Sequence, residues 1–164
     1  YVLVRPGIAI YGLDPLGGDP AEYGLRPAMT VQARVLLAKR VAAGAGVSYG
    51  HTYTTDRETT LAVVPVGYAD GVPRAGGNRA PVLAGGAQRT IAGRVCMDQF
   101  VLDVGDDPLA AGDRVVLWGP GDDGEPTVDD WAAAAGTINY EIVARFGSAR
   151  VARIYDGLPQ EPSS

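Results

Sequence analysis

The sequence contains a single cysteine, a single histidine and a single lysine, and these shortages limit the chemistry open to it. With Cys96 alone, no disulfide can form within the chain, which suits a reducing, cytoplasmic environment. One histidine and one cysteine are also too few for the ligand spacings of a zinc or copper site, so we expect no metal. Because Lys39 is the only lysine, arginine makes up nearly all of the basic charge.

Long apolar runs and basic clusters are missing too. No stretch approaches the roughly 18 apolar residues that a membrane-spanning helix needs, and the first residues lack the features of a signal peptide. The net charge is −5 and the arginines are scattered along the chain. An acidic chain without a basic stripe argues against nucleic-acid binding. We therefore expect a soluble protein that binds neither membrane nor nucleic acid.

Short β-rich runs separated by Gly, Pro and Asp dominate the chain and predict a mainly β fold. Many such strands favour a closed or nearly closed antiparallel β-barrel. Helices are expected at residues 128–135, with Thr127 as N-cap and Gly136 as the stop, and at residues 138–146. The predicted strands are 29–36, 60–66, 81–83, 89–95, 100–104, 114–118 and 149–155.

The first 24 residues differ from the rest in their residue pattern. Residues 2–11 are predicted to form a buried strand that runs into a glycine turn, and residues 12–24 a connection rich in Gly, Pro and Asp. The chain begins inside an apolar run without an initiator methionine, so we expect it to be part of a longer protein. Residues 25–157 are expected to form the β domain, and residues 158–164 a tail.

Several residues have reactive side chains, but each also has an ordinary structural interpretation. Tyr49 and Tyr68 adjoin glycines, as at sites where backbone approaches a ligand, yet such tyrosines also pack turns. The only lysine could form a Schiff base or be a solvated strand residue. Cys96 could be a nucleophile, but a buried strand-end thiol is the favoured interpretation. For Asp70, Asp98 and Asp103 we prefer turn capping to metal binding.

Five segments follow one another along the chain: VRPGIAIYG (4–12), VSYGHTY (47–53), VGYADG (66–71), AGRVCMDQ (92–99) and TINYE (137–141). Together they resemble alanine racemases, in the family's order and approximate spacing, and the resemblance runs from the first residues to about Ile154. It implies a pyridoxal-phosphate enzyme that has an N-terminal (β/α)8 barrel and a mostly β C-terminal domain, and that works as a head-to-tail homodimer. This chain is similar to the last barrel strand plus the β domain.

The resemblance implies interconversion of L- and D-alanine for bacterial cell-wall biogenesis, by two-base proton exchange on a pyridoxal phosphate aldimine. Arg5 matches the arginine that hydrogen-bonds the cofactor's ring nitrogen, and its permanent charge discourages protonation of that nitrogen. Gly7 and Ile8 match positions whose backbone N–H groups contact the cofactor phosphate. Tyr140 matches the tyrosine whose hydroxyl reaches the same phosphate.

Tyr49 matches the catalytic tyrosine that exchanges the α-proton on one face of the substrate, while a lysine serves the opposite face. Met97 matches the residue whose backbone N–H binds the substrate carboxylate. In the family dimer, Tyr49, Tyr68 and Met97 reach the partner subunit's site, whereas the cofactor-binding residues serve their own. The residues that match the substrate entrance are Tyr68, Arg74, Arg94 and Ile138.

Two alternatives remain open at this point. A racemase of the same fold acting on serine or another amino acid would carry the same segments. A non-catalytic β-barrel binding module would account for the composition but not for the five segments together.

The family's Schiff-base lysine lies in the barrel domain, and Lys39 does not match it. We therefore predict that this polypeptide alone forms no stable covalent adduct with pyridoxal phosphate and is inactive by itself. Absorbance spectroscopy of the chain mixed with the cofactor tests this. A Schiff-base band that persists in the unaltered chain and disappears in Lys39→Ala would contradict the prediction.

Overall fold

The computed structural model describes residues 3–156, where short strands and 3₁₀ turns are followed by two helices. The strands are β1 (Val31–Arg34), β2 (Leu37–Val41), β3 (Gly46–Val47), β4 (Tyr53–Thr54), β5 (Thr59–Val64), β6 (Pro81–Ala84), β7 (Ala87–Thr90), β8 (Phe100–Gly105) and β9 (Arg114–Trp118). The 3₁₀ turns are η1 (Ile8–Tyr11), η2 (Pro20–Tyr23), η3 (Tyr49–His51) and η4 (Arg74–Gly76), and the α-helices are α1 (Val128–Ala135) and α2 (Asn139–Arg145).

All strand pairs are antiparallel and form three sheets, ordered β1-β9-β6-β7, β2-β5-β8 and β3-β4. The two larger sheets are joined on both sides. On one side the chain passes from β1 into β2, with Val35 N–H bonded to Asp113 O and Leu36 N–H to Val63 O. On the other side, a bridge between Ile91 and Leu102 connects the end of β7 to β8. The predicted mainly β, barrel-like antiparallel domain is therefore confirmed.

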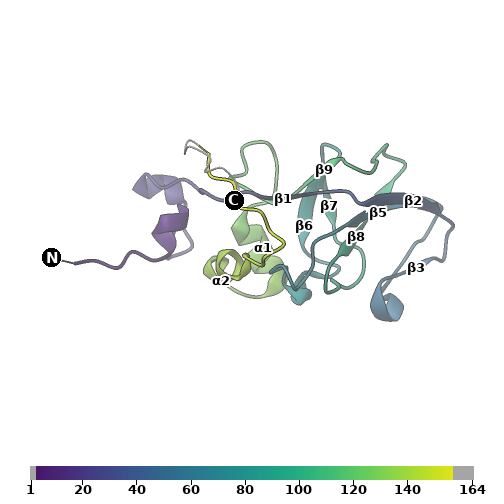
Figure 1. The fold of residues 1–164 in the computed structure, drawn as a ribbon, viewed down its shortest axis with the longest axis horizontal. Helices are drawn as coiled ribbons and strands as arrows, with labels where there is room; N and C mark the ends of the chain where they lie inside the picture. Colours follow the sequence, from purple (N-terminus) through teal and green to yellow (C-terminus); the bar gives the residue numbers. More distant parts are fainter. Residues whose placement is uncertain (1–2, 157–164) are drawn as a thin grey trace.

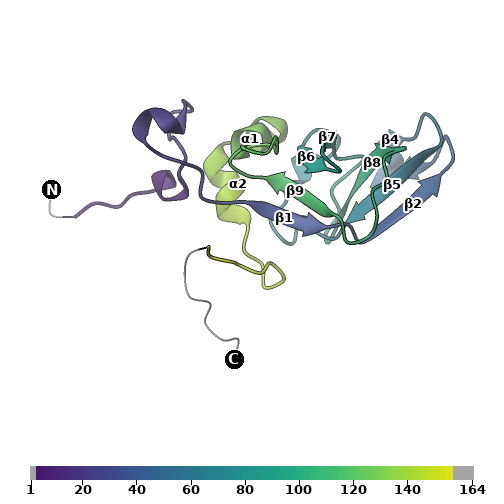
Figure 2. The ribbon, with the colours of Figure 1, turned by 90° about the horizontal axis from the view of Figure 1, so that it is seen from above.

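Aromatic side chains join the helices to the sheet. The buried Trp118 ring lies edge-on to Trp131 of α1, with centroids 5.3 Å apart, and to Phe146 after α2, at 4.6 Å. Trp131 Nε1 donates to Leu117 O at 2.6 Å, so its polar atom is satisfied inside the core. As a result, α1 and α2 lie together beside the start of β1 and the end of β9 (Figure 2).

Helix α1 begins and ends at the predicted residues. Thr127 accepts a hydrogen bond from Asp130 N–H, and the Asp130 carboxylate accepts from Thr127 N–H, which completes a capping box. Gly136 ends the helix in the left-handed conformation, with φ of 69°. The second helix, predicted at 138–146, is observed as α2. No helix within residues 3–156 is long and apolar enough to cross a bilayer.

Two predicted strands, 2–11 and 149–155, are absent from the described residues, and the strand predicted at 89–95 is observed only at its start, in β7. Residues 3–7 of the expected strand 2–11 have no regular structure and are exposed, and η1 follows them. A strand needs a hydrogen-bonded neighbour, and no strand in the described part of the chain pairs with these residues. Residues 149–155 form no strand because Ser148 turns the chain, accepting Val151 N–H at its carbonyl and Arg150 N–H at its hydroxyl.

The segment before β1 extends away from the β domain at one end of the molecule, and β3 lies at the other end (Figure 1). Whether residues 1–24 belong to a separate barrel domain stays a prediction. The expected tail, 158–164, lies outside the described residues.

Candidate functional site

The turn that carries Tyr68 is bonded to the main chain of residues 93–97, called here the 93–97 segment. Tyr68 N–H donates to Cys96 O at 3.0 Å, and Ala69 N–H donates to Met97 O at 2.9 Å. The contact is so close that a Cβ on Gly67 would lie 2.3 Å from Met97 O and 2.4 Å from Cys96 O. Only glycine fits there, so Gly67 is what lets the Tyr68 turn approach the 93–97 segment.

An ion pair between the buried Asp70 and the half-exposed Arg150 fixes the same turn. The Asp70 carboxylate is 2% exposed and accepts from Gly67 N–H at 2.9 Å, which closes the turn as expected for a capping aspartate. Arg150 donates to both of its oxygens, at 3.0 and 2.7 Å, and also to Asp98 at 2.8 Å. The Ser148 hydroxyl adds a further bond to Asp70. The C-terminal loop thus joins the Tyr68 turn to the residue after Met97.

Burial by itself raises the pKa of the Asp70 carboxyl. The Arg150 guanidinium, the Gly67 N–H and the Ser148 hydroxyl together outweigh burial, so the pKa lies below its usual value. The Asp70 carboxylate is therefore charged near neutral pH and remains paired with the Arg150 guanidinium.

Tyr49 lies at the start of η3, between β3 and β4, and its side chain is 72% exposed. Its turn also contacts the 93–97 segment. The Ser48 hydroxyl donates to Arg94 O at 2.7 Å, and a Cβ on Gly50 would meet the Arg94 guanidinium carbon at 3.4 Å. The phenol is thus presented to solvent from a turn that is bonded to the same segment as the Tyr68 turn.

The β3–β4 hairpin that carries Tyr49 is fixed to the domain through Asp103 of β8. This carboxylate accepts from the Tyr53 hydroxyl at 2.8 Å, from the Thr59 hydroxyl and from Gly105 N–H. Burial, together with the carboxylate, raises the pKa of Tyr53 to about 12, so this phenol stays protonated and continues to donate.

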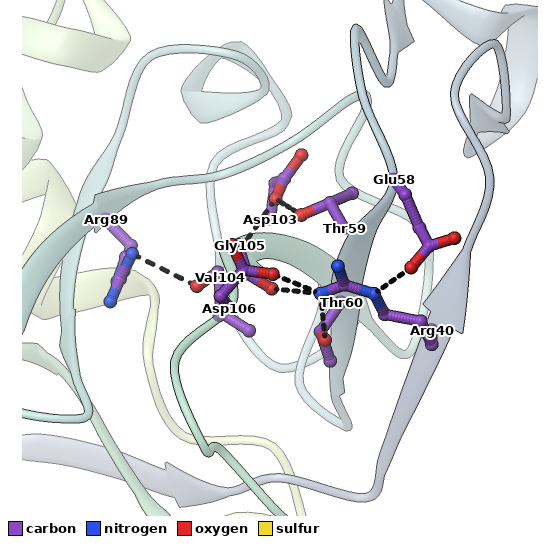
Figure 3. Close-up of polar contacts among 9 residues, drawn as sticks. All are labelled: Arg40, Glu58, Thr59, Thr60, Arg89, Asp103, Val104, Gly105 and Asp106. Carbon is purple, nitrogen blue, oxygen red and sulfur yellow. Dashed lines mark hydrogen bonds and ion pairs between the residues drawn. The ribbon is translucent and has the colours of Figure 1, made fainter.

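Arg40 of β2 adds a second set of bonds nearby, across β2, β5 and β8. It donates to Glu58 at 3.0 Å, to Asp106 at 2.6 Å and to the Gly105 carbonyl at 3.1 Å (Figure 3). The guanidinium thereby joins the ends of the strands at the base of the hairpin.

A second group of predicted residues gathers near the N-terminus. A Cβ on Gly7 would lie 3.7 Å from the Tyr140 hydroxyl, so the turn before η1 lies directly against this tyrosine of α2. The Tyr140 ring also contacts Tyr11, with centroids 6.0 Å apart. Ile8 is buried, while Arg5 is exposed. Hydroxyl, guanidinium and backbone N–H groups are donors that suit the anionic phosphate and the ring nitrogen of pyridoxal phosphate.

The predicted site residues fall into two groups by their contacts, although the Tyr68 turn also lies against the end of α2, where a Cβ on Gly71 would be 2.6 Å from Arg145 O. Arg74 lies over the Tyr68 ring, 5.7 Å from its centroid. Tyr68 contacts the 93–97 segment through its backbone N–H, and Arg94 and Met97 belong to that segment. The exposed Ile138 precedes α2 and so belongs with Tyr140. Along the long axis, β3 and α2 are well apart (Figure 1).

Sequence reasoning missed Ser48, Asn78 and Arg150, which bond to residues 15 to 80 positions away. One local signal exists, because Asn78 follows two glycines and asparagine tolerates positive φ. Cys96 is half-buried and lies in a loop, where a buried strand-end position was expected. Among residues 3–156, no group of three or more His, Cys, Asp or Glu side chains could hold a metal ion.

A sequence model of the family described as alanine racemase, C-terminal domain, matches residues 28–155, well over half of the chain. The chain belongs to the alanine racemase family. An alanine racemase from Salinispora arenicola is 70% identical over 155 residues, which cover 94% of this chain and 41% of that protein. The chain therefore spans about two fifths of the length of such curated relatives.

Solved alanine racemase structures have the same fold. The enzyme from Streptomyces coelicolor A3(2) matches with a TM-score of 0.90 and 58% identity, over 94% of this chain and 41% of that one. The Bartonella henselae alanine racemase, described with covalently bound pyridoxal phosphate, matches with a TM-score of 0.80 and 36% identity, over 92% of this chain and 41% of that one.

Replacing Asp70 by asparagine is predicted to lower the free energy of unfolding by about 1–3 kcal/mol at neutral pH, since the charge-assisted bonds to Arg150 are lost. The folded-state pKa lies below the unfolded value of about 3.9, so the stabilisation is present above about pH 4 and lost as the pH falls through the folded pKa. The difference between wild type and Asp70→Asn should therefore shrink in acid.

Denaturant titrations over a pH series measure both effects. Asp98→Asn is the matched control, because it removes the exposed partner of the same arginine and should cost less. Equal losses in the two variants, or a difference that does not depend on pH, would contradict this account of Asp70.

Proposed function

We propose that this chain is the C-terminal part of an alanine racemase and supplies its catalytic tyrosine, Tyr49. The observation that carries the proposal is the exposed phenol, on a turn bonded to the same 93–97 segment that holds Tyr68 and ends at Met97. A side chain that exchanges a proton with substrate must be accessible and fixed in position. Membership of the alanine racemase family supplies the reaction.

Racemisation needs a proton-exchanging group on each face of the substrate α-carbon. Tyr49 exchanges the proton on one face through its hydroxyl, and a lysine outside this chain serves the other face. The proposal does not assign this role to Lys39, which is an exposed residue of β2 that pairs with Leu61 of β5.

Pyridoxal phosphate, when bound, withdraws electrons from the α-carbon and so acidifies its proton. The proposal assigns the cofactor to Arg5, Gly7, Ile8 and Tyr140. The fit is supported by the contact between Gly7 and Tyr140, which brings backbone N–H groups and a hydroxyl to one place. The Arg5 guanidinium offers only hydrogen-bond donors and no acceptor, which suits an unprotonated ring nitrogen.

Met97 is assigned to the substrate carboxylate. Its carbonyl is bonded to Ala69 N–H, while its own N–H makes no hydrogen bond within the described residues. A fixed, unpaired N–H donor suits a carboxylate oxygen. Tyr68, Arg74, Arg94 and Ile138 are assigned to the substrate entrance, where three of the four are near or within the 93–97 segment.

The separation between the Tyr49 turn and α2 supports a head-to-tail homodimer with shared sites. In a single copy, β3, which leads into the Tyr49 turn, and α2, which carries Tyr140, lie well apart along the long axis (Figure 1). In the proposed dimer, Tyr49, Tyr68 and Met97 complete the partner's site, while Arg5 and Tyr140 serve their own. The product, D-alanine, is proposed to supply the bacterial cell wall.

Tyr49→Phe in the complete enzyme is predicted to reduce turnover by about 100-fold or more, because the ring is retained but the proton-exchanging oxygen is lost. Conversion of L- to D-alanine, followed by polarimetry or a coupled assay, measures this. Tyr23→Phe is the control, since Tyr23 is an exposed tyrosine on η2 outside the site, and it should leave turnover unchanged. Near-normal turnover in Tyr49→Phe would remove the proposed role.

A further inference from the structure

The turn that carries Tyr49 has an unfavourable backbone. Positive φ angles occur at Ser48 (61°), Gly50 (71°) and His51 (45°), three of four consecutive residues. At Ser48 the angle is combined with ψ of −172°, a region that is almost exclusive to glycine. Such a conformation persists only where surrounding contacts impose it.

Tyr49 itself contributes little to holding this geometry. Its side chain is 72% exposed, so packing of the ring cannot fix the direction of the hydroxyl. The position of the phenol is therefore set by the backbone on either side of it, at residues 48 and 50–52.

On the N-terminal side, the turn is held by Ser48. Its hydroxyl donates to Arg94 O at 2.7 Å and lies 3.2 Å from Cys96 Sγ. The main chain is also in direct contact here, because a Cβ on Gly93 would lie 2.8 Å from Val47 O and 3.1 Å from Ser48 Cβ. A hydrogen bond and a close backbone contact thus impose the positive φ of Ser48.

On the C-terminal side, the turn is held by Asn78. Its Nδ2 donates to Thr52 Oγ1 at 3.1 Å and to Thr52 O at 3.3 Å. Its Oδ1 accepts from Gly93 N–H at 2.6 Å, and its own N–H donates to Gly93 O at 3.1 Å. Asn78 therefore connects Thr52 to the same 93–97 segment that Ser48 contacts.

We propose that Ser48 and Asn78 are positioning residues for the Tyr49 phenol, acting by holding both ends of its turn to the 93–97 segment. The inference rests on the proposed catalytic role of Tyr49. Neither side chain is assigned to substrate or cofactor, and both act through the backbone. Because Met97 belongs to the same segment, the two residues set the distance between the proton-exchanging oxygen and the group assigned to the substrate carboxylate.

Two substitutions in the complete enzyme test the two ends separately. Ser48→Ala keeps the Cβ and removes the bond to Arg94 O. Asn78→Asp keeps the acceptor for Gly93 N–H and replaces the donor to the Thr52 carbonyl by an acceptor. We expect kcat to fall between about 5-fold and 100-fold, because small displacements of a proton-exchanging group are costly, with KM changed less than about two-fold.

Isotope effects separate positioning from simple loss of structure. With α-deuterated alanine, the isotope effect on kcat/KM should rise for the enantiomer whose α-proton Tyr49 removes, because that transfer becomes more rate-limiting. It should fall for the other enantiomer. Loss of folded protein lowers the rate with both enantiomers and leaves the two isotope effects unchanged.

Thr127→Ala is the matched control, because it removes a structural hydroxyl at the N-cap of α1, away from the Tyr49 turn. It should leave both isotope effects at their wild-type values. Ser48→Gly also removes the hydroxyl but relieves the backbone strain at residue 48. It therefore replaces Ser48→Ala as the test if the alanine variant does not fold. The expected result for Ser48→Gly is the same change in isotope effects as for Ser48→Ala.

The inference would be overturned if the isotope effects keep their wild-type values both in Ser48→Ala and in Asn78→Asp. Where Ser48→Ala does not fold, Ser48→Gly takes its place in this comparison. If Tyr49→Phe abolishes turnover in the same series, only the positioning role fails. Normal turnover in Tyr49→Phe would instead remove the catalytic role on which the inference rests.

Discussion

The candidate site depends on a short stretch of backbone, the 93–97 segment, to which separate turns are hydrogen-bonded. The Tyr68 turn donates to Cys96 O and Met97 O, and Ser48 donates to Arg94 O. A Cβ at Gly67 or at Gly93 would lie within 3 Å of main-chain atoms, so only glycine fits at these two positions. Backbone-to-backbone contact leaves little freedom, so the relative position of Tyr49, Tyr68 and Met97 is set by main-chain geometry more than by side-chain packing.

Two sets of charged contacts keep these turns against the 93–97 segment. The Arg150 guanidinium holds Asp70 and Asp98, one on each side of the junction between the Tyr68 turn and the Met97 loop. Asp103 holds the base of the β3–β4 hairpin through Tyr53 (and through Thr59, shown in Figure 3). The barrel-like domain thus serves as a rigid support for an accessible phenol at one end, while the group proposed to hold the cofactor lies toward the other.

The sequence predicts best where the determining contacts are local. Helix α1 was placed correctly because Thr127, Asp130 and Gly136 lie within ten residues of one another and each has a defined capping role. The strand expected at residues 2–11 failed because an apolar pattern does not show whether a partner strand is present. The proposed site residues were predicted from linear motifs, but Asn78 and Arg150 were not, since their partners lie far away in the sequence.

The direct test of the role of the 93–97 segment is amide hydrogen exchange at Tyr68 and Ala69 in Gly67→Ala. The added Cβ would collide with the carbonyls of Cys96 and Met97, so both amides should lose their acceptors and exchange faster than in wild type. Gly86→Ala, with φ of 75° and no atom within 4 Å of the added Cβ, controls for glycine replacement at a distant turn and should leave both rates unchanged. Unchanged exchange at Tyr68 and Ala69 in Gly67→Ala would contradict the claim that main-chain contact with this segment fixes the site.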